Sequence, residues 1–228
     1  CTQNDHVMLA AKSGKCIRFP VNDVRVFKSR TSDGVRGMKL ADGDEVVSMT
    51  ILRGIDCTAE ERQAYLKRAS AQRRVEGEQM EPSDENVAEV SLSEERYNEM
   101  AAAEEFILTV TENGYGKRSS AYEYRTTGRG GSGIVNIITS ERNGKVVASQ
   151  PVIAANQIML MTDRATVIRV PVHDIRIAGR NTQGVTILKT GAGEKVVSVV
   201  TVPEGENGIA EDGADEAGAP AAPVAEQA

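Results

Sequence analysis

The sequence predicts an all-β protein built from three repeats of a small antiparallel sheet, with a helical insertion after the first repeat and an acidic tail. Two observations support this fold class. A long motif recurs in the two halves of the chain, and short runs of Val, Ile and Leu are separated by turn residues. With 228 residues the chain is long enough to bury a core. No apolar stretch approaches the roughly 18 residues of a membrane-spanning helix, so none is predicted.

The recurring motif defines the repeats. Residues 17–25 read IRFPVNDVR and residues 168–176 read IRVPVHDIR, at a spacing of 151 residues. After one inserted residue the match continues from 30–48 to 180–198, at a spacing of 150. A middle copy fits at 107–147. The chain therefore contains three units of about 48 residues.

Each unit holds four short apolar runs, which is typical of a four-stranded antiparallel sheet. Tandem units of this size are typical of propeller-like blades, which bury their faces against each other. We therefore expect blades at 1–55, 105–153 and 154–202. Three blades cannot close a ring, and the chain begins with Cys1 rather than Met, so we expect it to be part of a longer protein.

Residues 56–104 predict an acidic helical hairpin. A capping box at 58–61 opens a helix that runs to about Val75, and a second box at 91–94 opens a run to about Glu105.

The charges are segregated along the chain. Residues 203–228 carry seven acidic and no basic side chains and few branched apolar residues, so we expect a disordered acidic tail. Residues 56–105 carry 14 acidic and 6 basic side chains. The blade segments 1–55 and 106–202 together carry 21 basic and 12 acidic ones, so the net charge of −6 conceals +9 on the blades. This indicates a basic surface for a polyanion; the alternative is ordinary solvated charge.

Two sets of arginines recur at fixed places in the units. The first set alternates with apolar residues along a strand, so we expect it to point away from the core. The second set precedes a recurring glycine in polar connections that we expect at the surface. Along a curved array these cations would form a stripe that matches the phosphates of duplex DNA. The predicted DNA-binding residues are Arg18, Arg118 and Arg169 (first set), Arg30, Arg129 and Arg180 (second set), and Lys117. The alternative is that they only keep exposed strand faces soluble.

The sequence predicts no catalytic or metal site in this chain. Three cysteines and two histidines have no metal-ligand spacing. The segment 128–133 satisfies the pattern GxGxxG, but it leads into a strand-like run, whereas a dinucleotide site needs a helix there.

Four segments carry a resemblance to a known family: 114–118 (GYGKR), 141–144 (ERNG), 157–159 (QIM) and 179–185 (GRNTQGV). They closely resemble the C-terminal domain of the A subunit of bacterial DNA gyrase. The resemblance covers about 2–55 and 105–202. It implies a six-bladed β-pinwheel, of which this chain would hold the last three blades and the acidic tail. It also implies that the domain binds and wraps duplex DNA, which lets a type II topoisomerase introduce negative supercoils.

The resemblance further implies the setting of the chain. The gyrase A subunit works in a heterotetramer with a second copy of itself and with the gyrase B subunit, which supplies ATP and Mg²⁺ binding, in the cytoplasm with the nucleoid; no cofactor is expected in this fragment. The catalytic tyrosine belongs to an N-terminal domain, so we do not expect Tyr97 to be catalytic. The family's QRRGGKG box is not matched, because residues 72–77 depart from it after three positions. Two alternatives stay open: the A subunit of topoisomerase IV, and a propeller-like interaction scaffold without DNA binding.

Overall fold

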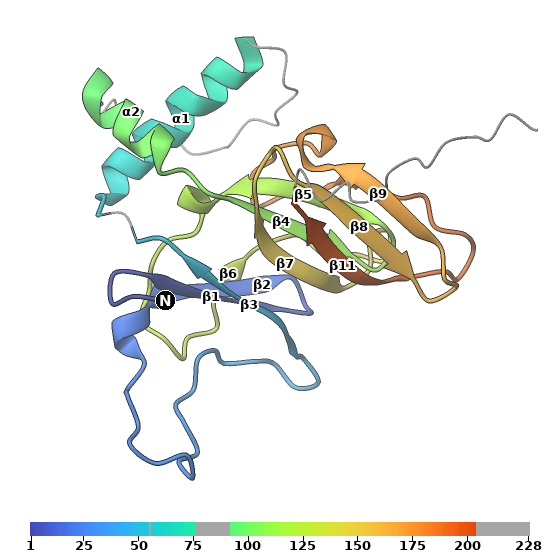
Figure 1. Cartoon of the computed structure of the whole chain (residues 1–228), viewed down its shortest axis with the longest axis horizontal. Coiled ribbons are helices and arrows are strands. Elements are labelled where there is room, and N and C mark those ends of the chain that lie inside the picture. Colours follow the sequence, from blue (N-terminus) through green and yellow to red (C-terminus); the bar gives the residue numbers. More distant parts are fainter. Residues whose placement is uncertain (55, 76–91, 204–228) are drawn as a thin grey trace, which may run out of the picture.

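Three antiparallel sheets follow one another along the molecule, and two helices lie beside the first two sheets (Figure 1). The computed structural model describes residues 1–54, 56–75 and 92–203. The strand orders are β3-β1-β2-β6, β10-β5-β4-β7 and β11-β8-β9. The strands are β1 (His6–Ala11), β2 (Lys15–Pro20), β3 (Val46–Leu52), β4 (Phe106–Thr111), β5 (Tyr115–Ser120), β6 (Ile134–Val135), β7 (Val146–Val152), β8 (Gln157–Thr162), β9 (Val167–Pro171), β10 (Val185–Thr186) and β11 (Val196–Val202). A short 3₁₀ helix follows the second strand of each unit: η1 (Val21–Asp23), η2 (Ala121–Glu123) and η3 (Val172–Asp174).

A tight turn joins the first two strands of each unit. The turn residues Gly14 and Gly114 have φ of +88° and +76°, a conformation that favours glycine. A Cβ at Gly14 would lie 2.4 Å from the carbonyl oxygen of Ile137, and one at Gly114 would lie 2.1 Å from that of Leu188. In both units the lack of a side chain at the glycine thus lets the backbone of the next unit approach closely. The third unit has Ala165 at this place, with φ of 63°.

The fourth strand of a sheet comes from the following unit. β6 of the second unit pairs with β2, and β10 of the third unit pairs with β5. Gly133 and Gly184 lead into these strands with positive φ, and a Cβ there would lie 2.2 Å from the Cys16 carbonyl oxygen and 2.7 Å from that of Gly116. Each unit was expected to form its own four-stranded sheet, and in this respect the prediction is wrong. The third sheet has three strands, with β9 at its edge.

The hydrophobic core lies in the seams between the sheets. One cluster joins the first and second sheets and another joins the second and third, so strands such as β4 bury both faces. The first seam includes Met8, Ala10, Cys16, Leu52, Ile107 and Tyr124, and the second includes Leu108, Val110, Ile158, Leu160, Val172 and Val196. Blades that bury their faces against each other are therefore confirmed.

The insertion contains the two predicted helices, α1 (Ala59–Val75) and α2 (Glu94–Ala102). The first capping box is formed: the Glu61 amide donates to Thr58 Oγ1 (3.1 Å) and the Thr58 amide donates to Glu61 Oε2 (2.8 Å). The N-cap of α2 is Ser93, whose side chain accepts from the Arg96 amide, so the predicted start two residues earlier is wrong. Ser91, the link between the helices and the tail after Pro203 lie outside the described residues.

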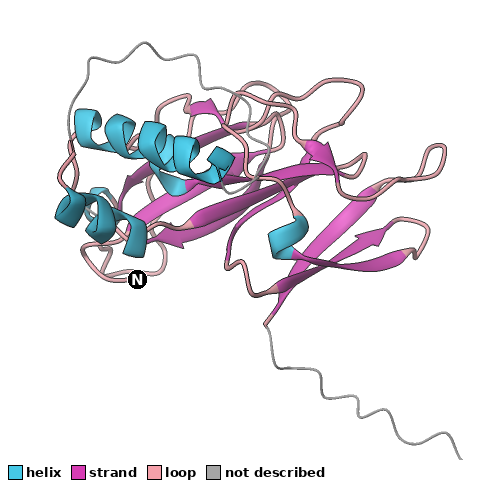
Figure 2. Ribbon diagram, turned by 90° about the horizontal axis from the view of Figure 1, so that it is seen from above, coloured by secondary structure: helices cyan, strands magenta, loops and turns pink. Residues whose placement is uncertain are grey.

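The two helices lie against each other (Figure 2), and aromatic rings join them to η2. The ring centroid of Tyr65 lies 5.2 Å from that of Tyr97 and 5.0 Å from that of Tyr122 on η2. The hydroxyl of Tyr122 donates to the carbonyl of Met100 (2.9 Å). The hairpin is thus anchored on the second blade.

Candidate nucleic-acid interface

The first arginine set joins each blade to the next. Arg18 is 6% exposed, and its Nη1 donates to the carbonyl of Ala121 on η2 (2.8 Å). Arg118 is 5% exposed and donates to the carbonyls of Ile175 (2.6 Å) and His173 (3.0 Å), at η3. The prediction that these two arginines point to solvent is wrong. Strand alternation predicted an outward face, but that face is covered by the next blade, so neither guanidinium presents itself to a phosphate in this structure.

Lys117 is also buried, and the prediction that it adds to an exposed stripe is wrong. It is 0% exposed, and its ammonium donates to the carbonyls of Gly179 (2.6 Å) and Arg180 (2.8 Å) and to the hydroxyl of Thr182 (3.2 Å). Ile17 occupies the same place in the first unit. The ammonium therefore holds the connection of the third unit onto the second sheet.

The second arginine set reaches back to the preceding unit. Arg129 donates through Nε to the carbonyl of Asp23 (2.8 Å) and through Nη1 to that of Arg36 (3.0 Å). Arg180 donates to the carbonyl of Val135 (3.5 Å), which occupies the place of Arg36 in the repeat. Arg129 is nevertheless exposed and Arg180 is half-buried. We call Arg18, Arg118, Arg129 and Arg180 the inter-blade arginines.

One member of each set lies at an end of the array and is exposed. Arg169 lies on β9, at the place that Arg18 and Arg118 occupy in the other units, and within the described residues no further unit covers it. Arg30 lies in the first unit, at the place of Arg129. The repetition of these arginines therefore marks contacts between blades, and in the first set the exposure of an arginine depends on whether a neighbouring unit covers it.

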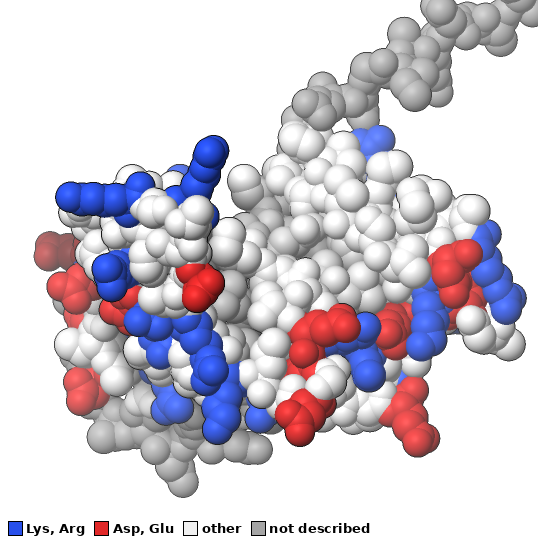
Figure 3. Space-filling model, turned by 90° about the horizontal axis from the view of Figure 1, so that it is seen from below, with Lys and Arg blue, Asp and Glu red and all other residues white. Residues whose placement is uncertain are grey.

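An exposed basic surface lies on the connection of the first unit and its neighbour in the second. This surface, which we call the basic loop surface, contains Arg25, Lys28, Arg30, Arg36, Lys39, Arg125 and Arg129, all of which are exposed. Hydrogen bonds join its two connections: the Lys39 amide donates to the Gly131 carbonyl (2.8 Å) and the Gly130 amide donates to the Gly37 carbonyl (2.7 Å). On the face drawn in Figure 3, Lys and Arg gather on the side of the first unit. Asp33 is the acidic residue between Arg30 and Arg36.

Repetition revealed Arg30 and Arg129 of the basic loop surface, but it did not reveal the members that do not recur. Lys28 and Arg36 have no basic counterpart in the other units. The signal that was present in the sequence is the density of basic residues in the connection 24–40, compared with its single acidic residue.

The comparison with protein families decides the assignment. A family model described as the DNA gyrase C-terminal domain, a beta-propeller, matches residues 5–53, 105–152 and 156–203. The chain belongs to the DNA gyrase C-terminal domain family. The matched segments contain the three sheets, so the fold class and the resemblance predicted from the sequence are confirmed.

The relatives agree with this family. The chain is 51% identical over 212 residues to the DNA gyrase A subunit of Rickettsia bellii, an alignment that covers 93% of this chain and 23% of that protein. It is 37% identical over 201 residues to the DNA gyrase A subunit of Salmonella typhimurium, covering 88% and 17%. The chain therefore spans about a quarter or less of the length of these relatives.

A solved structure agrees with the fold. The C-terminal domain of DNA topoisomerase IV superposes with a TM-score of 0.61 at 19% identity, covering 88% of this chain and 47% of that one. This similarity supports the blade architecture.

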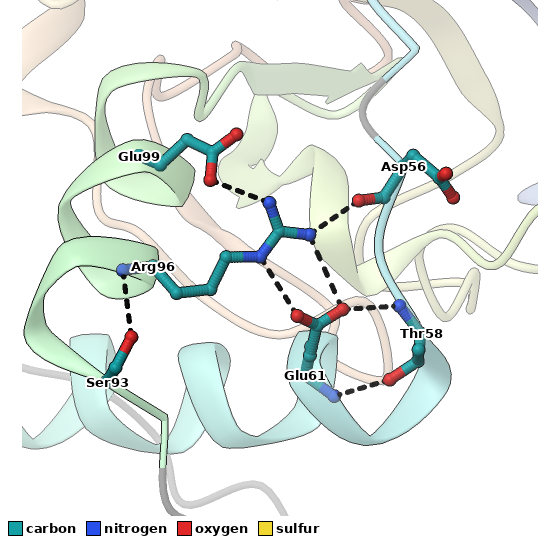
Figure 4. A network of polar contacts seen from close by, with 6 residues as sticks. All are labelled: Asp56, Thr58, Glu61, Ser93, Arg96 and Glu99. Carbon is teal, nitrogen blue, oxygen red and sulfur yellow. Dashed lines mark hydrogen bonds and ion pairs between the residues drawn. The ribbon is translucent and has the colours of Figure 1, made fainter.

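The gyrase family match leaves out the hairpin, in which a polar network around Arg96 joins α2 to the start of α1 (Figure 4). Arg96 donates through Nε to Glu61 Oε1 (2.9 Å), through Nη1 to Glu99 Oε2 (2.7 Å) and through Nη2 to the carbonyl of Asp56 (2.5 Å). Hydrogen bonds from Arg96 lower the pKa of Glu61, and the bonds to both carboxylates raise the pKa of Arg96. The neighbouring Tyr97 is 9% exposed. Through these contacts Arg96 stabilises the structure of the hairpin.

A histidine belongs to the first seam. His6 Nδ1 accepts from Arg18 Nε (3.0 Å), and burial followed by the charge of Arg18 lowers the pKa of His6 below its ordinary 6.5. In the described part of the chain, no group of three or more His, Cys, Asp or Glu side chains is placed to hold a metal ion. None of the helices within the described residues has the length and apolar character to cross a membrane.

Proposed function

We propose that this chain is the DNA-binding and DNA-wrapping part of a DNA gyrase A subunit, within an ATP-dependent type II topoisomerase that negatively supercoils double-stranded DNA. The observation that carries the proposal is the family match over all three blades, together with relatives named as the A subunit of DNA gyrase at about half identity. The exposed basic loop surface supports a polyanionic partner.

The blade seams would supply the rigidity that wrapping needs. Bending a short duplex by 40–90° costs on the order of 1–6 kcal/mol, which phosphate contacts must offset. The buried cations Arg18, Arg118 and Lys117 donate hydrogen bonds from one blade to the next, which would fix the angle between successive blades. A surface that is already curved before binding loses less of its binding free energy to its own ordering. In this account the repeated cations shape the surface, and the exposed cations contact DNA.

The proposed DNA contacts therefore differ from those read from the repeat. We keep Arg30 and Arg129 as phosphate contacts because both lie on the basic loop surface. Arg169 and Arg180 stay proposals, since one is exposed and the other is half-buried. The other contacts we propose are Arg25, Lys28, Arg36, Lys39 and Arg125, all of which are exposed.

Further blades in the longer protein would cover both ends of this array. The third sheet exposes Met159, Met161 and Val200, and within residues 1–54, 56–75 and 92–203 no fourth strand pairs with its edge strand β9. The first sheet exposes Met49, at 67%. Apolar faces of this kind are expected where another blade of the same type packs.

The remaining parts of the proposal concern the whole enzyme. We place the catalytic tyrosine in the N-terminal part of the full-length protein, and ATP and Mg²⁺ in the gyrase B subunit of a heterotetramer that holds two copies of each subunit. The proposed location is the cytoplasm, with the nucleoid. We also propose that the seven carboxylates of residues 203–228 compete with phosphates for the basic blades.

Ligation of nicked circular DNA in the presence of the full-length protein tests the proposal. Wrapping with a positive sense traps a positive change in linking number, which grows with protein concentration. An unchanged linking number at saturating protein contradicts the wrapping function.

The two other candidate functions have less support. The likeness to topoisomerase IV concerns the fold, and a scaffold without DNA binding predicts an affinity for DNA that is negligible at all salt concentrations.

A further inference from the structure

A groove of about 570 Å³ opens across the seam between the second and third blades. Tyr115 and Arg142 of the second unit line one wall, and Leu188, Lys189 and Lys195 of the third unit line the other. Leu188 is 9% exposed, whereas Arg142 and Lys189 are exposed. The groove thus has a partly apolar floor and a basic rim.

The acidic side chains around this groove are occupied by protein groups. Glu194 accepts from the Thr162 hydroxyl (2.6 Å) and from the Gly191 amide (2.8 Å), and these bonds, that of Thr162 first, lower the pKa of Glu194 to about 2. Glu112 pairs with Lys195 (3.1 Å). Among the described residues, no carboxylate forms an ion pair with Arg142 or Lys189. Two cations therefore remain for an external anion.

The second unit positions one of these cations. The guanidinium of Arg142 lies 5.0 Å from the centre of the Tyr115 ring, and its Nε donates to the Tyr115 hydroxyl (3.3 Å). The hydrogen bond from Arg142, followed by that from Thr186, lowers the pKa of Tyr115. Nε is thus used within the protein, and the two terminal nitrogens of the fork are the ones suited to a phosphate.

The corresponding place in the first seam lacks this arrangement. By the alignment of the units, Lys15 replaces Tyr115, Asp42 replaces Arg142 and Ile138 replaces Lys189. A basic rim that contains both cations is therefore specific to the second seam and does not follow from the repeat.

We propose that the groove between the second and third blades binds a phosphodiester group of duplex DNA, with Arg142 and Lys189 as the contacting residues and Tyr115 as the residue that positions Arg142. This inference rests on the proposed DNA-wrapping function and names a contact that the repeated arginines did not indicate. The ligand is a phosphodiester of the backbone, so binding is independent of base sequence.

The test uses the full-length protein and a duplex long enough to be wrapped, with affinity measured over a series of salt concentrations. Arg142→Ala with Lys189→Ala should lower the affinity roughly tenfold at low salt and reduce the slope of log K against log salt by about 2. Arg142→Gln with Lys189→Gln tests the same charges with less change of shape. The control is Lys67→Ala, which removes an exposed cation from α1.

The outcomes separate this inference from the function on which it rests. If the unaltered protein binds DNA without a steep salt dependence, the wrapping function itself is contradicted. If the unaltered protein binds normally and both double variants match Lys67→Ala in affinity and slope, the groove proposal alone is overturned. The groove proposal would also be overturned if ATP at micromolar concentration protected the groove residues while the variants kept their affinity for DNA. The groove would then bind a free nucleotide rather than the DNA backbone.

Discussion

Replacing Arg118 with methionine tests whether the inter-blade arginines hold the blades together. The side chain is 5% exposed and donates to the carbonyls of Ile175 and His173 at 2.6 and 3.0 Å. A hydrogen bond from a charged donor contributes about 1.5–3 kcal/mol, and methionine keeps much of the apolar volume while leaving both carbonyls without this donor. We expect the second seam to weaken by about 3 kcal/mol, which is roughly a hundredfold in its opening equilibrium.

Hydrogen exchange in the full-length protein measures this change locally. The amide of Ala178 donates to the carbonyl of Arg118 (2.8 Å) and that of Arg118 donates to the carbonyl of Arg176 (2.9 Å), so both bonds cross the seam. Their exchange should accelerate by about the same hundredfold, while Arg125→Met, at an exposed position, should leave it unchanged. Exchange within about threefold of the unaltered protein would refute the reasoning, because the buried guanidinium would then contribute little to the seam.

Three further predictions concern the tail, a titrating group and a strand entry. Deleting residues 203–228 should raise DNA affinity at low salt and have little effect at high salt, as measured by fluorescence anisotropy; equal affinities at low salt would exclude competition by the tail. Because the folded-state pKa of His6 is lowered, its contribution to stability is fully present above pH 6.5 and is lost as pH falls through the folded value, so the protection factors of amides across the first seam should fall on acidification. His6→Gln should remove that pH dependence, and a variant that keeps it would show that another group titrates. Gly184→Ala should cost at least about 1 kcal/mol and release β10 from β5, because φ is +77° and the new Cβ would lie 2.7 Å from the Gly116 carbonyl oxygen; unchanged protection of the Val185 amide would count against this.

The blade repeat could be predicted because its sequence motifs are continuous in the chain and many residues long. Runs such as 17–25 and 168–176 carry both the strand pattern and the turn residues that end it. The pairing of β6 and β10 with the sheet of the preceding unit could not be predicted in the same way. These strands have two residues each and show no periodicity of their own. What places them in the preceding sheet is the close approach of Gly133 and Gly184 to another unit's backbone.

The candidate site was predicted less well than the fold, for a related reason. Alternation along β2 and β5 assigns Arg18 and Arg118 to the face opposite the core, and this rule assumes that the opposite face meets water. In a stack of blades both faces are buried, so a periodic arginine can be an internal donor. Some of the positions that do face solvent, such as Lys28 and Arg36, vary between the units. Repetition therefore identified the architecture, and local charge density was the better guide to the proposed interface.

The salt dependence of DNA binding by the full-length protein tests the central claim most directly. Arg25, Lys28 and Arg36 are changed together to alanine, and log K is measured against log salt for the variant and the unaltered protein. If the basic loop surface contacts phosphates, the slope should fall by about 0.9 for each phosphate that is no longer neutralised, or up to about 3 in total, for all DNA sequences alike. An unchanged slope and affinity would contradict the claim that these exposed cations, rather than the arginines buried between the blades, bind the DNA.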